Sequence, residues 1–96
     1  MTHSIKDPVA RAIAESFGRL IVAQRTRQNL ARRVVVQRLG ISNKRVRQLE
    51  KGGAIVRLDE VVKLAHLYGV NHARLLKDTL QDAAFLRAYD QRLWKA

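Results

Sequence analysis

Apolar residues recur every three or four positions along most of the chain, which is the spacing of one buried helix face. A first helix is predicted to begin at Asp7-Pro8, because Asp is a good N-cap and proline is tolerated at the first helical position. It should run to about Arg27. Its predicted buried stripe consists of Val9, Ile13, Phe17, Leu20 and Ile21. Gly18 lies inside it and weakens the prediction of an unbroken helix. Residues 1–7 are predicted to form an arm, which is either mobile, packed on the core or in contact with DNA.

Two short helices that meet at a tight turn are predicted at about 31–39 and 43–51. Gly40 lies at the turn, where glycine adopts a left-handed backbone at little cost. Ser42 is a good N-cap for the second helix, and Gly52-Gly53 should end it. Each helix has one apolar side to bury. These sides are predicted to consist of Leu30, Val35, Val36 and Leu39 on the first helix and of Val46 and Leu49 on the second.

Two further helices are predicted after a short loop. The first spans 58–68 and ends at Gly69. The apolar side of this amphipathic helix is predicted to consist of Leu58, Val61, Val62, Ala65 and Leu67. Asn71 should cap the second, a short helix that carries Leu75 and Leu76.

The last segment is predicted to form an extra helix over 78–95, capped by Asp78 or Thr79. It carries the one Trp of the chain, so it either folds back on the core or joins a second subunit. The sequence shows no strand pattern, internal repeat or low-complexity tract. We therefore expect a single all-α domain over 1–96, with its core at 17–76.

The net charge of +11 is concentrated in one part of the chain. Residues 19–57 hold eleven basic residues and a single acidic one, which gives this block a net charge of +10. An evenly solvated basic surface would spread the excess through the chain. The confined charge instead indicates a surface for a polyanion, where counterion release drives binding.

The helix over 43–51 is predicted to present polar side chains that recognise DNA. Amide and basic groups hydrogen-bond base edges in the major groove, where asparagine suits adenine and lysine suits guanine. The predicted base contacts are Asn43, Lys44, Arg47 and Gln48. Contacts to phosphate set the register without reading sequence. They are predicted for Arg32, Arg33, Ser42, Arg45 and Arg57.

With these residues in place, the chain resembles the Cro/CI-type (xenobiotic-response-element-like) helix-turn-helix family of phage and bacterial regulators. The resemblance covers about 17–76 and rests on a combined spacing of motifs. They are Ile21 and Arg25, then Leu30, Val35, Leu39-Gly40-Ile41-Ser42, Val46, Leu49-Glu50 and Gly52, and finally Leu64 to Val70 with Leu75-Leu76. It implies a five-helix, lambda-repressor-like DNA-binding domain, here with an extended N-terminal helix and an extra C-terminal helix.

The resemblance also implies a structural ion pair between Arg25 and Glu50, which would lock the DNA-reading helix against the first helix. The alternative is a surface ion pair worth about 0 to 1 kcal/mol. The chain departs from the family at Arg32, where a glutamine is usual, and at Val36, where a small alanine is usual. The loop after the reading helix also lacks the frequent proline.

Other chemistry finds less support in the sequence. No Ser–His–Asp or Cys–His set is present, and the three histidines lack the spacing of zinc ligands. We therefore expect no catalysis, cofactor or metal. The apolar runs are too short to span a membrane and the N-terminus lacks a secretory signal, so we expect no membrane partner and a cytoplasmic location, in a bacterium or encoded by a phage.

The sequence thus predicts a sequence-specific regulator of transcription that binds double-stranded DNA, and in particular a repressor. It would bind a pseudo-palindromic operator as a homodimer. The alternative is an antitoxin of a toxin–antitoxin pair that also represses its own operon, with a toxin or other regulator as its partner. A restriction–modification controller and a conjugation-system regulator remain open. A single-strand binder is disfavoured, because few aromatic residues are present to stack on bases.

Overall fold

The computed structural model describes residues 5–82 and 85–87 of the 96-residue chain. Within this part the chain is helical and contains no strand. The helices are α1 (Pro8–Arg27), α2 (Arg32–Leu39), α3 (Asn43–Glu50), α4 (Leu58–Tyr68) and α5 (His72–Leu80), and a further helical stretch covers 85–87. The predicted all-α fold is confirmed.

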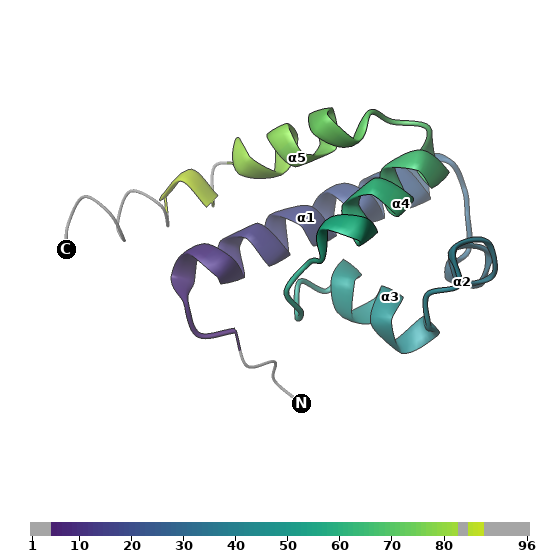
Figure 1. The fold of residues 1–96 in the computed structure, drawn as a ribbon, viewed down its shortest axis with the longest axis horizontal. Helices are drawn as coiled ribbons and strands as arrows, with labels where there is room; N and C mark the ends of the chain where they lie inside the picture. Colours follow the sequence, from purple (N-terminus) through teal and green to yellow (C-terminus); the bar gives the residue numbers. More distant parts are fainter. Residues whose placement is uncertain (1–4, 83–84, 88–96) are drawn as a thin grey trace.

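The long helix α1 is the axis of the fold, with α3, α4 and α5 all packed against it. Figure 1 shows α3 and α5 on opposite sides of α1, with α4 crossing between them and α2 at one end. The short helix α2 contacts α3 and α4. This arrangement leaves one side each of α2 and α3 facing away from the rest of the domain.

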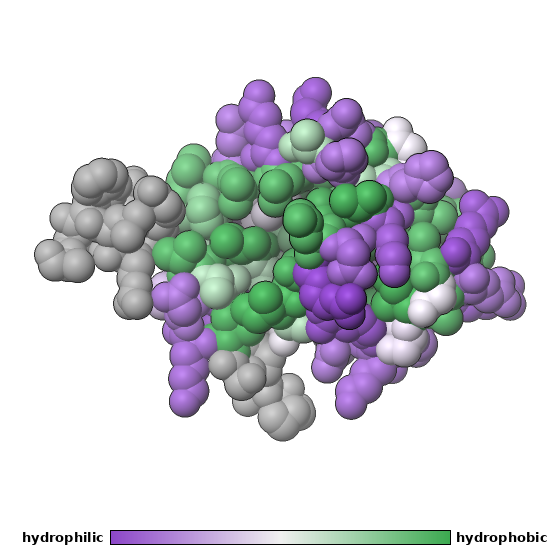
Figure 2. All heavy atoms as spheres, viewed as in Figure 1, coloured by the Kyte–Doolittle hydropathy of each residue, from purple (hydrophilic) through white to green (hydrophobic). Residues whose placement is uncertain are grey.

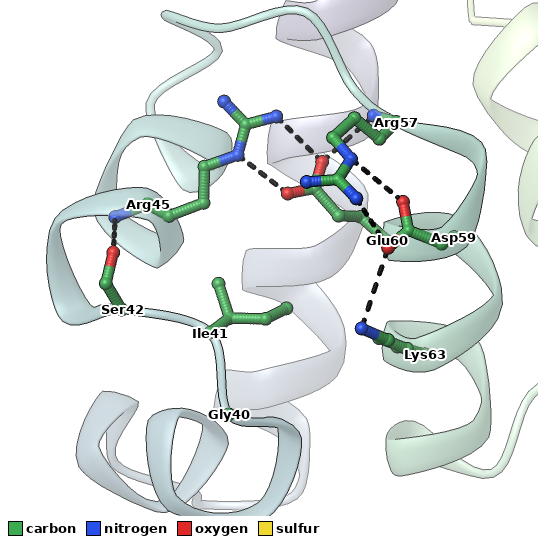
Figure 3. A pocket seen from close by; sticks show the side chains of 8 residues that line it. All are labelled: Gly40, Ile41, Ser42, Arg45, Arg57, Asp59, Glu60 and Lys63. Carbon is green, nitrogen blue, oxygen red and sulfur yellow. Dashed lines mark hydrogen bonds and ion pairs between the residues drawn. The ribbon is translucent and has the colours of Figure 1, made fainter.

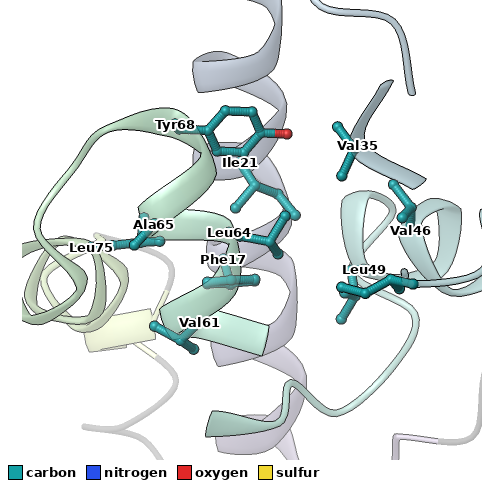
Figure 4. Packing of buried hydrophobic residues seen from close by; sticks show 11 residues of the cluster. Phe17, Ile21, Val35, Val46, Leu49, Val61, Leu64, Ala65, Tyr68 and Leu75 are labelled. Atoms are coloured by element: carbon teal, nitrogen blue, oxygen red, sulfur yellow. The ribbon is translucent and has the colours of Figure 1, made fainter. Parts of the chain in front are cut away.

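The hydrophobic core lies where α1 meets the other helices. Phe17 and Ile21 of α1 are both 1% exposed and form its centre. Figure 4 shows Val35, Val46 and Leu49 reaching toward them from α2 and α3, with α4 on the other side. The apolar sides predicted for α2 and α3 therefore do face the core.

Two of the predicted helix starts, at Asp7 and Asn71, are formed by the predicted side chains. Asp7 accepts a hydrogen bond from the Ala10 amide at 2.9 Å, and Asn71 accepts one from the Arg74 amide at 3.0 Å. Such caps satisfy amides of the first turn that have no partner inside the helix. Helix α2 begins one residue later than predicted and α3 ends one residue earlier.

Gly18 does not interrupt α1, and a close helix crossing explains why a glycine stands there. A Cβ atom at this position would lie 2.7 Å from the carbonyl oxygens of both Leu49 and Glu50. The absence of a side chain therefore lets α1 approach the end of α3. The distance between these two helices depends on this residue.

The buried face of α4 differs from the prediction. Its buried residues include Val61, Leu64, Ala65 and Tyr68. Leu58 is 72% exposed and Val62 is 43% exposed, so the predicted apolar side of this helix does not coincide with its buried face. At 100° per residue both lie on the same flank of α4, turned away from the centre of the buried face.

The predicted helix start at Asp78 or Thr79 is also wrong, because α5 continues through both residues to Leu80. Thr79 is fully buried, and its hydroxyl donates to the Leu75 carbonyl oxygen at 2.9 Å. Ser16 of α1 donates to the Thr79 carbonyl oxygen at 2.9 Å, which ties α5 to α1. Thr79 is thus a packing residue inside a helix.

The two ends of the chain fall partly outside the described residues. Ile5, from the predicted arm, is 8% exposed, and its carbonyl oxygen accepts hydrogen bonds from Arg11. At the other end Phe85 is buried. Most of the helix predicted for 78–95 lies outside the described residues.

Candidate nucleic-acid interface

Helices α2 and α3 are joined by the predicted glycine turn. Gly40 has a φ of 67°, in the left-handed region, and its amide donates to the Val36 carbonyl oxygen at 3.0 Å. Ser42 caps α3 by accepting a hydrogen bond from the Arg45 amide at 3.1 Å. Turn and cap together set the direction in which α3 leaves α2.

The four residues predicted to contact bases lie on the side of α3 opposite its buried residues. Val46 and Leu49 are 2% and 1% exposed and fix the inward side of the helix. The outward residues are Asn43, Lys44 and Arg47, which are exposed, and Gln48, which is half-buried. The structure therefore groups them on one accessible face.

The predicted ion pair between Arg25 and Glu50 is formed and is bidentate. The Arg25 Nε and Nη2 atoms lie 2.6 and 3.2 Å from the two carboxylate oxygens of Glu50. The Arg25 Nη1 atom also donates to the Leu30 carbonyl oxygen at 3.0 Å. The Glu50 side chain is only 4% exposed. The buried, bidentate geometry is that of a structural ion pair which holds α3 against α1, and not that of a weak surface ion pair.

Arg32 joins the same carboxylate. Its Nε atom donates to Glu50 Oε1 at 2.9 Å, while the Arg32 side chain stays 43% exposed. Two guanidinium groups therefore share one carboxylate, and the cluster keeps a net positive charge. This charge extends to the surface at Arg32, a residue predicted to contact phosphate.

A second buried carboxylate holds the other side of α3. Glu60 of α4 is 3% exposed and accepts hydrogen bonds from Arg45 Nε and Nη2 at 2.7 and 2.8 Å. Arg45 Nη2 also donates to the Ile55 carbonyl oxygen at 2.8 Å. Figure 3 shows the Arg45 side chain reaching from α3 to Glu60. Arg45, predicted to contact phosphate, is thus engaged within the domain.

The environment of Glu60 favours its charged form. Burial alone would raise the pKa of the Glu60 carboxyl, but hydrogen bonds from the Arg45 guanidinium and the Arg57 amide outweigh this effect. The pKa is therefore lowered from its ordinary value. The Arg57 amide lies 2.9 Å from Glu60 Oε1, so one carboxylate both anchors α3 and caps α4.

The remaining predicted phosphate residues lie at the surface. Arg57 is exposed and pairs with Asp59 at 3.0 Å, and Lys63 lies 3.5 Å from the same carboxylate. Arg33 and Ser42 are also exposed. These ion pairs lie along an open polar hollow between the starts of α3 and α4 (Figure 3). Exposed pairs of this kind are weak, so a phosphate can compete for Arg57.

Tyr68 of α4 belongs to the hydrophobic core. Its hydroxyl is buried and has no hydrogen-bond partner within residues 5–82 and 85–87. Burial, reinforced by the negative charge of Glu50 and opposed by Arg25, raises the pKa of Tyr68 to about 12. The hydroxyl therefore stays protonated at neutral pH.

Sequence reasoning did not identify Glu60. The available signal was its position three residues after the N-cap Arg57, where a glutamate side chain can return to the N-cap amide. Nothing along the chain links it to Arg45, fifteen residues earlier, because that pairing depends on how α3 and α4 are packed.

The comparisons with known proteins agree with this geometry. The model of a family described as a helix-turn-helix domain matches residues 16–76, about two thirds of the chain. No curated protein and no solved structure matches the chain. Within the described residues no three His, Asp or Glu side chains form a group that could hold a metal ion, and no helix is long and apolar enough to cross a membrane.

Proposed function

We propose that this chain, which belongs to the helix-turn-helix domain family, is a sequence-specific regulator of transcription of the Cro/CI type. Its ligand is double-stranded DNA, and repression follows from occupying a promoter. The proposal rests on how α3 is held in the domain and on which of its side chains are exposed. Two buried carboxylates, Glu50 and Glu60, anchor α3 to α1 and to α4, and its outward face presents polar side chains that suit base edges.

In this mechanism α3 enters the major groove with its N-terminal residues toward the base edges. Asn43 reads adenine through N6 and N7, and Lys44 donates to guanine O6 and N7. Arg47 and Gln48, about one turn later, reach a neighbouring base or the far strand. Anchoring α3 before binding lowers the entropy lost when these side chains meet DNA.

Phosphate contacts come from residues around α3. Arg32 and Arg33 lie on α2, and Arg57 lies at the start of α4, so they flank the reading helix on two sides. The Ser42 hydroxyl accepts the cap hydrogen bond and still has its own proton to donate. Because Arg45 Nε and Nη2 are engaged by Glu60 and Ile55, we assign Arg45 a positioning role in addition to its charge.

Substitutions on the two helices test this division of roles. Lys44→Ala should change the preferred base at one position of the site, with a loss of about 1–3 kcal/mol against the best sequence. Arg33→Ala is the matched control, because it removes the same charge without touching a base. It should weaken binding to all sequences alike and reduce the salt slope by about one. If both variants weakened all sequences alike, α3 would not be the reading helix.

We further propose that the protein acts as a homodimer on a pseudo-palindromic operator, with half-sites about one helical turn apart. A single short α3 reads only a few base pairs, and pairing two copies multiplies the specificity. The action on an operator implies a cytoplasmic location, in a bacterium or encoded by a phage.

The alternative function is that of an antitoxin which binds a toxin and also represses its own operon. It is favoured by large apolar side chains left exposed on the domain, at Ile55, Leu58 and Val62. An antitoxin should relieve the growth arrest caused by a toxin encoded beside it. If the toxin arrested growth to the same extent with and without this protein, the antitoxin function would be ruled out.

A further inference from the structure

Arg32, at the start of α2, is held in place by a buried carboxylate although it lies at the surface. Its Nε atom donates to Glu50 Oε1 at 2.9 Å, while the Arg32 side chain stays 43% exposed. Glu50 is fixed in turn, because its side chain is 4% exposed and Arg25 binds both of its oxygens. The Arg32 guanidinium therefore has far less freedom than that of an ordinary exposed arginine.

The other edge of the Arg32 guanidinium is open to a ligand. Within residues 5–82 and 85–87 the Arg32 Nη1 and Nη2 atoms make no hydrogen bond. The five N–H groups of a guanidinium lie in one plane and point in fixed directions, so the terminal edge can bind phosphate oxygens while Nε–H stays on a carboxylate. Figure 2 shows hydrophilic residues gathered at the end of the molecule where Figure 1 places α2, a surface suited to a polyanion.

We propose that Arg32 is a specificity-determining residue which, held by Glu50, detects where a phosphate of the DNA backbone lies. The inference rests on the proposed function, in which Arg32 contacts phosphate while α3 reads bases. Hydrogen bonds weaken steeply when they lengthen or bend. A phosphate must therefore come to the fixed guanidinium, and DNA whose backbone lies elsewhere must be deformed, at a cost that depends on its base steps.

The position that Arg32 detects is measured relative to the reading helix. Glu50 is the last residue of α3, and α2 packs against α3 as well. The open edge of Arg32 and the outward side chains of α3 thus belong to one rigid unit. The distance between the bases that are read and the bound phosphate is set by the protein, so the contact responds to the shape of the DNA at that point.

The neighbouring Arg33 lacks such a tether. It is exposed, and no hydrogen bond or ion pair holds its side chain within the described part of the chain. A flexible side chain follows a displaced phosphate by changing rotamer, so it contributes charge with little dependence on position. Arg45 is tethered too, but its Nε and Nη2 atoms are both engaged and its side chain is only 27% exposed. Arg32 combines a tether with an open edge.

Arg32 is not required to neutralise Glu50. Arg25 already forms a bidentate pair with this carboxylate and holds α3 against α1. The second guanidinium leaves the cluster with an excess positive charge, which lies at the exposed residue. A glutamine, usual in the family at this position, has one NH₂ group and no charge, so it offers no second donor edge. The arginine is thus better explained by a ligand at its open edge than by stability.

The test compares Arg32→Lys with Arg33→Lys in the full-length protein. Lysine keeps the positive charge but has no planar fork, so it cannot hold a carboxylate and a phosphate in fixed directions at once. Both positions are exposed, and circular dichroism with thermal melting establishes that each variant is folded. If Arg32 contributed charge alone, the two variants would behave alike.

Binding is measured with duplexes selected from random sequence by the wild-type protein. The bases that α3 contacts are identified by methylation interference and kept constant, while the flanking steps either form a stiff A-tract or include flexible TA and CA steps. The wild type should prefer one flank by on the order of tenfold. Arg32→Lys should reduce this preference to less than about threefold with an unchanged salt slope, because the number of charges is the same. Arg33→Lys should change the affinity for both duplexes by the same factor.

The inference is overturned if the folded Arg32→Lys variant keeps the flank preference of the wild type, or if Arg33→Lys removes that preference to the same extent. A wild-type protein without any flank preference would also overturn it. The proposed function is tested separately, because it requires a preference for the contacted bases, which both variants should retain. A flank preference that is lost in Arg32→Lys, without any preference for bases, contradicts only base reading by α3. A base preference with an unchanged flank preference in Arg32→Lys contradicts only this inference.

Discussion

Replacing Glu60 with glutamine tests the anchor that joins α3 to α4. Glu60 accepts three hydrogen bonds, two from the Arg45 guanidinium and one from the Arg57 amide, at 2.7 to 2.9 Å. Glutamine is nearly the same size but carries no charge and keeps only one acceptor oxygen. If that oxygen faces Arg57 and Arg45 Nη2, the glutamine NH₂ group faces the Arg45 Nε–H, and two donors meet.

The expected cost follows from this geometry. A hydrogen bond to a charged group contributes about 1.5–3 kcal/mol. The Arg45 side chain is 27% exposed, so water can reach part of the unpaired guanidinium and keep the cost near the lower end. We expect the free energy of unfolding to fall by about 2 kcal/mol, which lowers the Tm of a domain this size by about 8–16 °C.

Thermal and urea unfolding followed by circular dichroism measure this loss. The control is Asp59→Asn, one residue away, whose carboxylate makes only exposed ion pairs worth about 0–1 kcal/mol. Equal stability losses in the two variants would refute the role of Glu60 as an anchor. In the Glu60→Gln variant the specific DNA affinity should fall as well, while the salt slope should not change, because no phosphate contact is removed.

The same carboxyl predicts a dependence of stability on pH. Because the pKa of Glu60 is lowered in the folded state, its stabilising contribution is present above the unfolded pKa of about 4.3 and is lost as the pH falls through the folded value. The Glu60→Gln variant lacks this contribution. Its free energy of unfolding should therefore fall less steeply than that of the wild type below about pH 5.

Two further substitutions test the core. Replacing glycine by alanine stabilises an ordinary helix by about 1 kcal/mol. In Gly18→Ala, however, the new Cβ would lie 2.7 Å from two carbonyl oxygens, so we expect the free energy of unfolding, measured by chemical denaturation, to fall by about 1–3 kcal/mol. A rise in this free energy would contradict the close crossing of α1 and α3. Tyr68→Phe removes a buried hydroxyl that has no hydrogen-bond partner in the described residues, so the free energy of unfolding should be unchanged or higher. A fall of more than about 1 kcal/mol would show that the hydroxyl makes a hydrogen bond after all. In the wild type, stability should also fall as the pH rises from about 10 toward 12, because the folded pKa of Tyr68 exceeds its unfolded value, and the Phe variant should lack this fall.

Local signals allowed much of the fold to be predicted from sequence. Asp7-Pro8, Ser42 and Asn71 mark helix starts through contacts within four residues, and each forms the predicted cap. Gly40 marks the turn for the same reason. Caps and turns are determined by residues that are close in the sequence, so they can be predicted from local sequence patterns.

Features that depend on packing were predicted less well. Thr79 looked like a helix start, because threonine caps helices well, but its hydroxyl is satisfied inside α5 by Leu75. Leu58 and Val62 fit a helical stripe, and only the position of α1 decides that the buried face of α4 is turned away from them.

In the candidate site, too, local features could be predicted from sequence and features that depend on helix packing could not. The outward face of α3 could be predicted from helical periodicity, since Val46 and Leu49 fix the inward side. The pair between Arg25 and Glu50 was expected only from the family resemblance. The pair between Arg45 and Glu60 joins two helices that no local pattern connects, and Arg45 was therefore predicted to contact phosphate alone.

The proposed function requires that this domain recognise a particular DNA sequence. The most direct test is to select duplexes from random sequence with the wild-type protein and to measure its affinity for the best duplex and for random DNA at about 150 mM salt. We expect the selected duplex to bind at least about 10³-fold more tightly, as is typical of specific DNA-binding proteins. Affinities within about threefold of each other would show that the protein binds DNA only through its charge and would contradict the proposed function.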